Sequence, residues 1–137
     1  MPATRIQRMS QTAYAAVKQR RVDSEQSSAK KYRSFALKFP SLIHTSGLCQ
    51  AIAVAQADKS AGSDVLDDVV MTIRSITGDS IGVKSGDENS LPSRARSAGA
   101  VEYMRLTRLT MDAASLVKRY VEVVSPDKSP TADGENA

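Results

Sequence analysis

The pentapeptide Gly78-Asp79-Ser80-Ile81-Gly82 matches the G-x-S-x-G pattern that presents a nucleophilic serine in many hydrolases. That chemistry needs a strand before the serine, a helix after it, and a histidine and an acid further along the chain. Here a helical pattern precedes Ser80, a polar segment follows it, and the only histidine, His44, lies upstream. Because Gly, Asp and Ser together are typical of a turn, we predict a turn at this place and no hydrolase.

The sequence also has few residues that could form a metal site or a pair of catalytic acids. His44 and Cys49 supply two ligands where a zinc site needs at least three from the protein, so we predict a local hydrogen bond for His44 and a core position for Cys49. Asp67 and Asp68 are adjacent, and on a helix their side chains would diverge by about 100°; we expect both to be surface acids or to face a partner. No glycine-rich phosphate loop occurs. The sequence predicts no enzyme, no metal and no cofactor.

Basic residues are the remaining group with a recognisable chemistry. The 137 residues include 19 Lys and Arg against 15 Asp and Glu, a formal net charge of +4. Residues 1–59 and 91–124 are net basic, whereas 60–90 and 125–137 are net acidic. If the two basic segments pack side by side, they form one positive face that can contact phosphates without reading base sequence. The candidate RNA-binding residues are Arg5, Arg8, Lys18, Arg20, Arg21, Lys30, Lys31, Arg33, Arg105, Arg108, Lys118 and Arg119.

A second interpretation stays open at this point. Charged runs are commonly solvated surface, and the chain would then be a small helical adaptor that binds protein without contacting RNA. The chain has no Trp, four Tyr and two Phe. If nucleic acid is the partner, this shortage of rings favours contact with the backbone over stacking on bases.

The compartment follows from what the sequence lacks. Cys49 is the single cysteine, which excludes an internal disulfide and fits a reducing environment. No run approaches the roughly 18 apolar residues of a membrane span, and the first residues lack the apolar stretch of a signal peptide. We expect a cytoplasmic protein without a membrane partner.

The segments that must carry these residues have helical periodicity almost throughout. Thr4 is a candidate N-cap for a first helix with Ile6, Met9 and Ala13 on its inner side. A second helix follows the polar residues 23–28. We predict that it ends at Pro40, because the residue before a proline is disfavoured in a helix. A short connection would place these two helices antiparallel.

The rest of the chain continues the pattern. Residues 48–57 predict a buried, alanine-rich helix, and Ser63 or Asp64 is predicted to cap a fourth helix that ends at Gly78. Residues 79–99 predict a long loop with at most one short helical turn after Pro92. The last helix is predicted over 101–124, with Val101 and Met104 among its inward positions. The fold class is all-α, a compact bundle of about five or six helices with a long C-terminal helix. It forms a single domain over 1–124, followed by a disordered tail, 125–137.

Two stretches resemble the small-subunit family of the type III-B CRISPR RNA-targeting (Cmr) complex. Residues 31–53, KYRSFALKFPSLIHTSGLCQAIA, are similar to the family run K-Y-x-S/T-x-A-x-K-x-P-x-L-I-x-x-N/S-G-L-x-Q-A-L/I-A. Residues 102–108, EYMRLTR, are similar to its C-terminal element E-Y-x-x-L/A-T-R-x-A. The spacing in the first helix also matches. The family usually carries an aromatic residue where Ser115 stands here, and a more apolar helix where residues 79–99 stand.

The resemblance implies a small all-α subunit without catalytic activity. Copies would stack head to tail along the filament that carries the guide RNA and help to hold the guide–target duplex. The implied partners are the other Cmr subunits, CRISPR RNA, target RNA and neighbouring copies of the chain. An open stack needs heterologous contacts, which the acidic segment of one copy could make with a basic segment of the next.

Overall fold

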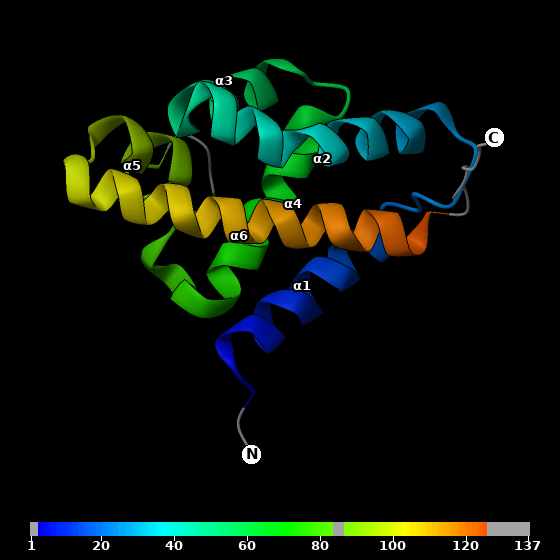
Figure 1. The fold of residues 1–137 in the computed structure, drawn as a ribbon, viewed down its shortest axis with the longest axis horizontal. Coiled ribbons are helices and arrows are strands. Elements are labelled where there is room, and N and C mark those ends of the chain that lie inside the picture. The colour runs from blue at the N-terminus through cyan, green and yellow to red at the C-terminus, as the bar shows by residue number, and fades with distance from the viewer. Residues whose placement is uncertain (1–2, 84–86, 126–137) are drawn as a thin grey trace.

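Helices account for all the regular structure that the computed structural model describes, which covers residues 3–83 and 87–125 (Figure 1). In chain order they are α1 (Arg5–Gln19), α2 (Ser27–Ser46), α3 (Leu48–Ala57), α4 (Gly62–Thr77), the short 3-10 helix η1 (Gly78–Ser80), α5 (Leu91–Ser97) and α6 (Ala100–Val124). Within these ranges no strand forms and no helix is long and apolar enough to cross a membrane. The predicted all-α bundle with a long last helix is confirmed. Beyond Ser125, the predicted tail lies outside the described residues.

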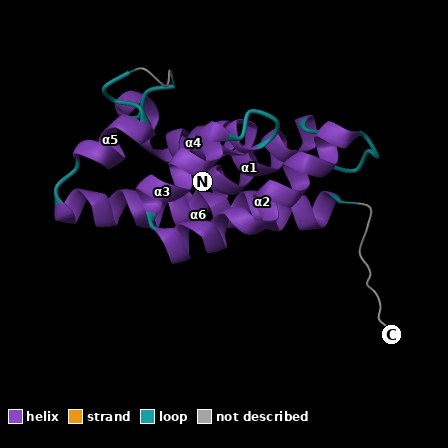
Figure 2. Ribbon diagram, turned by 90° about the horizontal axis from the view of Figure 1, so that it is seen from above, coloured by secondary structure: helices purple, strands orange, loops and turns teal. Residues whose placement is uncertain are grey.

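The long helix α6 contacts α1, α2 and α4. In Figure 2, α2 and α6 lie in one layer and α1 and α4 in the other, and one hydrophobic cluster contains residues from all six α-helices. The stripe of α6 that faces this cluster includes Leu106, Ala113 and Val117. Val101 and Met104 are 83% and 60% exposed. Their predicted inward position is wrong, because at about 100° per residue they lie off that stripe.

The first helix begins as the sequence predicts. The Thr4 hydroxyl accepts a hydrogen bond from the Gln7 N–H at 3.1 Å, and the Gln7 side chain accepts one from the Thr4 N–H at 2.7 Å. However, α1 packs against α4 and α6, and not antiparallel to α2 as predicted. The connection, residues 20–26, is long enough to carry the chain past the end of α6, so that α2 runs on the other side of it (Figure 1).

The second helix continues through Pro40, so its predicted end there is wrong. A proline inside a helix removes one backbone hydrogen bond, but the buried stripe continues on both sides of it with Phe39 and Ile43. Packing against α6, α3 and α4 therefore outweighs the lost bond. Gly47 ends the helix at φ 87°, in the left-handed region that favours glycine.

The corner after Gly47 is held by a residue from the other end of the chain. The Tyr103 hydroxyl accepts a hydrogen bond from the backbone N–H of Cys49 at 3.1 Å. Cys49 itself is half-buried against the hydrophobic cluster, consistent with its predicted core position. This contact joins α6 to the first turn of α3.

The helices α3 and α4 approach each other closely at Gly62. A Cβ atom built on Gly62 would lie 2.7 Å from the Ala55 carbonyl oxygen. Real Cβ atoms do not come this close to backbone, so the absence of a side chain sets the distance between the two helices. The fourth helix begins at Gly62 with Ala61 at its N-cap, so the predicted cap at Ser63 or Asp64 is wrong; both residues lie inside the first turn.

Residues 79–83 and 87–99 are more ordered than predicted. Leu91 is fully buried in α5, and Arg94 donates one hydrogen bond to the Ser80 carbonyl at 2.9 Å and pairs with Glu102. Ser80 lies at the end of η1, where its hydroxyl donates to the Thr77 carbonyl; the predicted turn is confirmed. The predicted short helical turn after Pro92 is present but is longer, since α5 begins at Leu91 and ends at Ser97; seven residues are too few to show a periodicity that would predict these bounds.

Candidate nucleic-acid interface

The predicted basic residues separate into several groups in the structure. The largest group lies where α1 ends, α2 begins and α6 ends, at one end of the molecule (Figure 1). We call this group the basic end. It consists of Lys18, Arg21, Lys30, Lys31, Arg33, Lys118 and Arg119. The sequence prediction that two basic segments come together therefore holds for these helix ends.

Packing between α1 and α6 aligns the helix ends. The ring of Tyr14 meets the ring of Tyr120 edge to face, with centroids 5.4 Å apart. Lys18 lies one turn beyond Tyr14, and its Nζ is 5.8 Å from the centroid of that ring. Lys18 and Arg21 line one hollow of about 400 Å³ together with Asp23, Ser24 and, from α6, Val124. The part of the basic end at Lys18 and Arg21 is thus concave, and α6 contributes to it from more than 100 residues away in the sequence.

Arg21 has an unusual backbone conformation. Its φ of 54° lies in the left-handed region, and it is the only described residue other than glycine there. Its N–H donates to the Lys18 carbonyl at 3.2 Å, and its own carbonyl accepts from the Ser24 N–H at 2.9 Å. A left-handed conformation costs a residue with a Cβ atom about 1–2 kcal/mol. Such strain is found most often at functional sites.

Counter-charges at the basic end are few and exposed. Lys30 pairs with Glu25 at 3.3 Å, and Arg119 with Glu122 at 4.0 Å. Exposed pairs of this kind contribute little free energy and can exchange partners. Arg33 is half-buried and donates to the Val22 carbonyl.

The other members of the group have no acidic partner. Among the residues that the structure describes, no carboxylate lies within ion-pair distance of Lys18, Arg21, Lys31 or Lys118. These four cations are available to an external anion.

Arg20 differs from its neighbours because its charge is already compensated. Its Nε and Nη2 atoms each lie 2.9 Å from an oxygen of Asp68, and its Nη1 lies 3.5 Å from Asp64. Tyr32 donates its hydroxyl proton to the same Asp68 carboxylate at 2.6 Å. The hydrogen bond to Asp68 raises the pKa of Arg20. Burial and the Asp68 carboxylate raise the pKa of Tyr32. We therefore leave Arg20 out of the proposed contact set.

The predicted surface position of Asp68 is wrong. Its side chain is only 8% exposed, because Arg20 and Tyr32 cover it and satisfy both of its oxygens. A buried carboxylate needs such partners. Asp67, the residue that precedes Asp68, is exposed as predicted.

The remaining candidates lie away from the basic end. Arg5 and Arg8 are exposed at the start of α1. Arg105 pairs with Glu102 at 3.1 Å, and the hydrogen bonds from Arg105 and Arg94 lower the pKa of that glutamate. Arg108 is exposed on the outer side of α6.

Metal ligands do not converge within the described part of the chain, where no three His, Cys, Asp or Glu side chains could share an ion. His44 is exposed in the last turn of α2. No hydrogen bond from its side chain occurs to another described residue, so its predicted local bond is not seen.

Comparisons with known proteins agree with this architecture. The family model described as CRISPR-associated protein (Cas_Cmr5) matches residues 5–124. The CRISPR system Cmr subunit Cmr5 of Thermus thermophilus is 31% identical over 126 residues, which cover 88% of this chain and 96% of that protein. The crystal structure of a CRISPR-associated Cmr5 family protein from the same organism has a TM-score of 0.72 at 31% identity, covering 90% of this chain and 98% of that one. The chain therefore belongs to the Cmr5 family.

Proposed function

We propose that this small subunit of a type III-B CRISPR (Cmr) complex contacts RNA phosphates through its basic end, and that its copies stack along the complex. Its partners are then the other Cmr subunits, the CRISPR RNA, the target RNA and neighbouring copies. It acts in the cytoplasm, in antiviral defence, and catalyses no reaction.

The convergence of three helix ends is the observation that supports this proposal. Lys18, Arg21, Lys31 and Lys118 come from α1, the turn after it, α2 and α6, and none is paired with an acid in the described structure. Lysine and arginine side chains bind phosphates independently of sequence and release condensed counterions as they do so. A subunit that must accept any guide sequence needs this kind of contact.

A structural role also agrees with the residues considered for catalysis. Ser80 donates its hydroxyl proton to the Thr77 carbonyl at 3.0 Å in an exposed turn. His44 is on a different helix, α2, where it too is exposed. This arrangement supports assigning cleavage to other subunits.

The test is target-RNA binding by the reconstituted complex over a series of salt concentrations. The double variant Lys18→Gln/Arg21→Gln removes two unpaired cations of the basic end. The matched control, Lys38→Gln/Arg96→Gln, removes two exposed cations elsewhere on the surface. We expect the slope of log affinity against log salt to decrease by about 0.7–0.9 for each phosphate that a copy no longer binds, and only in the first variant.

Two results would contradict the proposal. An unchanged slope in Lys18→Gln/Arg21→Gln would show that the basic end does not meet phosphate, which supports the interpretation as an adaptor that binds protein alone. An equal decrease in both variants would show that binding depends on total charge rather than on this surface.

A further inference from the structure

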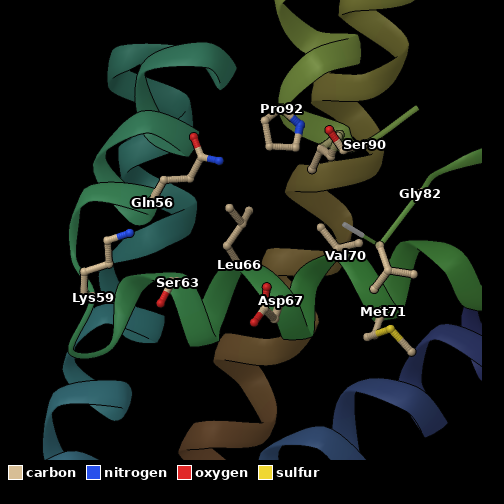
Figure 3. Close-up of a pocket in the computed structure, with 12 residues that line it drawn as sticks. Gln56, Lys59, Ser63, Leu66, Asp67, Val70, Met71, Gly82, Ser90 and Pro92 are labelled. Atoms are coloured by element: carbon tan, nitrogen blue, oxygen red, sulfur yellow. The ribbon is translucent and has the colours of Figure 1, made fainter. Parts of the chain in front are cut away.

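A pocket of about 390 Å³ opens between α3, α4 and the start of α5 (Figure 3). Its apolar lining includes Leu66 and Val70 of α4 and Pro92 of α5. Lys59 and Asp67 line the same opening and are exposed. The pocket thus combines an apolar interior with one acid and one base.

Neither charge of this pocket is compensated within the described structure. Asp67 lies beside Asp64 and Asp68, but Arg20, the cation nearest to these acids, is bound to the other two. Burial and the two neighbouring carboxylates raise the pKa of Asp67. Lys59 likewise has no carboxylate within ion-pair distance in the ranges described. A cation placed at Asp67 and an anion placed at Lys59 would both be favoured.

A second surface also combines apolar side chains with charged ones. The outer side of α6 has a shallow groove of about 430 Å³, lined by Tyr103, Met104, Thr107, Arg108, Met111 and Asp112. Met104 is 60% exposed, and Val101, one turn before it, is 83% exposed. Arg108 and Asp112 are one helical turn apart and are not within ion-pair distance of each other. This groove also presents apolar side chains with one base and one acid.

The two surfaces are separate within one molecule. The pocket lies among α3, α4 and the start of α5, the groove lies on α6 alone, and no residue lines both. The helices that form the pocket and the groove are packed into one hydrophobic cluster and hold the two surfaces in place. A contact between the pocket and the groove therefore requires two copies of the chain. Exposed apolar patches with polar rims are typical of protein interfaces. A phosphate would be repelled by Asp67, which disfavours RNA as the occupant of the pocket.

We propose that the pocket of one copy receives the exposed Met104 side chain from the α6 groove region of the next copy. Asp67 then faces Arg108, Lys59 faces Asp112, and Met104 lies against the apolar interior formed by Leu66 and Val70. The two charge pairs fix the orientation, and contact between two different surfaces propagates into an open stack. The proposal rests on the stacking part of the proposed function and adds the surfaces that make the contact.

The basic end stays free in this arrangement. None of its seven residues lines the pocket or the groove. Each added copy therefore brings its own phosphate-binding surface to the stack. The assignment also removes Arg108 from the candidate RNA contacts and gives it a protein partner.

The test is reciprocal charge reversal at the first pair. Asp67→Arg and Arg108→Asp each place like charges across the interface, whereas a mixture of the two variants restores an opposite pair at every contact. Self-association is measured by sedimentation velocity over a range of concentrations, and copies per reconstituted complex by native mass spectrometry. We expect each variant alone to associate roughly tenfold or more weakly than the wild type, and the mixture to recover. Glu88→Arg, the same acid-to-arginine change as Asp67→Arg at an exposed residue that lines neither surface, is the control.

The outcomes distinguish a failure of the assigned contact surfaces from a failure of the stacking hypothesis. Circular dichroism first establishes that each variant is folded. Wild-type-like association of both single variants, or failure of the mixture to recover, would overturn the assigned surfaces while stacking stands. A single wild-type copy both in solution and in the complex would overturn stacking as well, leaving the phosphate contacts to the salt series. Binding of another Cmr subunit in the pocket would appear as a loss of that subunit from complexes of the Asp67→Arg variant, and would also overturn the proposal.

Discussion

Arg20 and Asp68, 48 residues apart in the chain, form a two-pronged ion pair with both N–O distances at 2.9 Å. The pair fixes the end of α1 against the middle of α4. Tyr32 of α2 adds its hydroxyl proton to the same carboxylate, so three helices meet at one acid. The turn that follows Arg20 contains Arg21, so this ion pair positions part of the basic end.

Loss of the Asp68 charge tests this pair. Asp68→Asn leaves Arg20 without its counter-charge, and we expect the free energy of unfolding at pH 7 to fall by about 2–3 kcal/mol. The loss is smaller than for a fully buried pair because the Arg20 side chain is 31% exposed. Urea denaturation measures it. Asp67→Asn is the matched control, and it should leave stability unchanged or slightly higher, since the pKa of Asp67 is raised in the fold. Equal losses in both variants would contradict the assignment.

The Tyr32 hydroxyl should make the free energy of unfolding depend on pH in the alkaline range. Because the fold raises the pKa of Tyr32 above its usual value of 10.0, its contribution is complete below pH 10 and is lost as the pH rises further. We expect Tyr32→Phe to be less stable than the wild type by about 1.5–3 kcal/mol at pH 7, with a difference that shrinks above pH 10. Thermal unfolding between pH 7 and 11 measures it. Tyr14→Phe, at an exposed ring, should match the wild type throughout; a constant difference for Tyr32→Phe would contradict the prediction.

Arg21 should show opposite effects on stability and binding. Arg21→Gly removes the left-handed strain, and after the extra entropy of glycine in the unfolded chain we expect a net gain of about 0.5–1 kcal/mol. RNA affinity of the complex should fall, since a cation is removed. Arg21→Gln is the control that removes the charge and keeps the strain. If Arg21→Gly retains full RNA affinity, Arg21 makes no phosphate contact.

Gly62 should tolerate no side chain. In Gly62→Ala the new Cβ atom would be 2.7 Å from the Ala55 carbonyl oxygen, so α3 and α4 must separate. We expect a loss of about 1–3 kcal/mol in the free energy of unfolding. Gly99→Ala has no atom within 4 Å of the new Cβ; because Gly99 is the N-cap of α6, where alanine is less favourable than glycine, we expect a loss of no more than about 1 kcal/mol. A similar effect at both positions would show that close packing is not the cause.

Much of the fold could be predicted because the apolar periodicity is strong. The Thr4 cap, the helix after Gly47 and the long last helix all follow from local patterns. Pro40 gives a wrong prediction, because a local rule on proline does not include the packing of Phe39 and Ile43 on either side. Only a short turn after Pro92 could be predicted for α5, because the order of the whole helix depends on long-range contacts, above all those of Arg94 with Ser80 and Glu102.

The candidate site was predictable only in part. The residue types and the two basic segments are visible in the sequence, but the division of cations into paired and unpaired depends on the fold. Asp68 shows the limit. Its position on the α4 wheel lies nearer the buried stripe of Val65 and Val69 than that of Asp67 does. That signal could have predicted its burial, whereas Arg20 and Tyr32 as its partners could not have been found without the structure.

The hydrogen bond between Tyr103 and the Cys49 N–H brings together the two stretches that resemble the family. One stretch forms the corner at Gly47, and the other supplies the hydroxyl that closes it. The two motifs therefore form one structural junction, although Cys49 and Tyr103 lie 54 residues apart in the chain. Because the donor is a backbone N–H, any residue except proline can stand at position 49, and the closure of the corner depends on a hydroxyl at position 103.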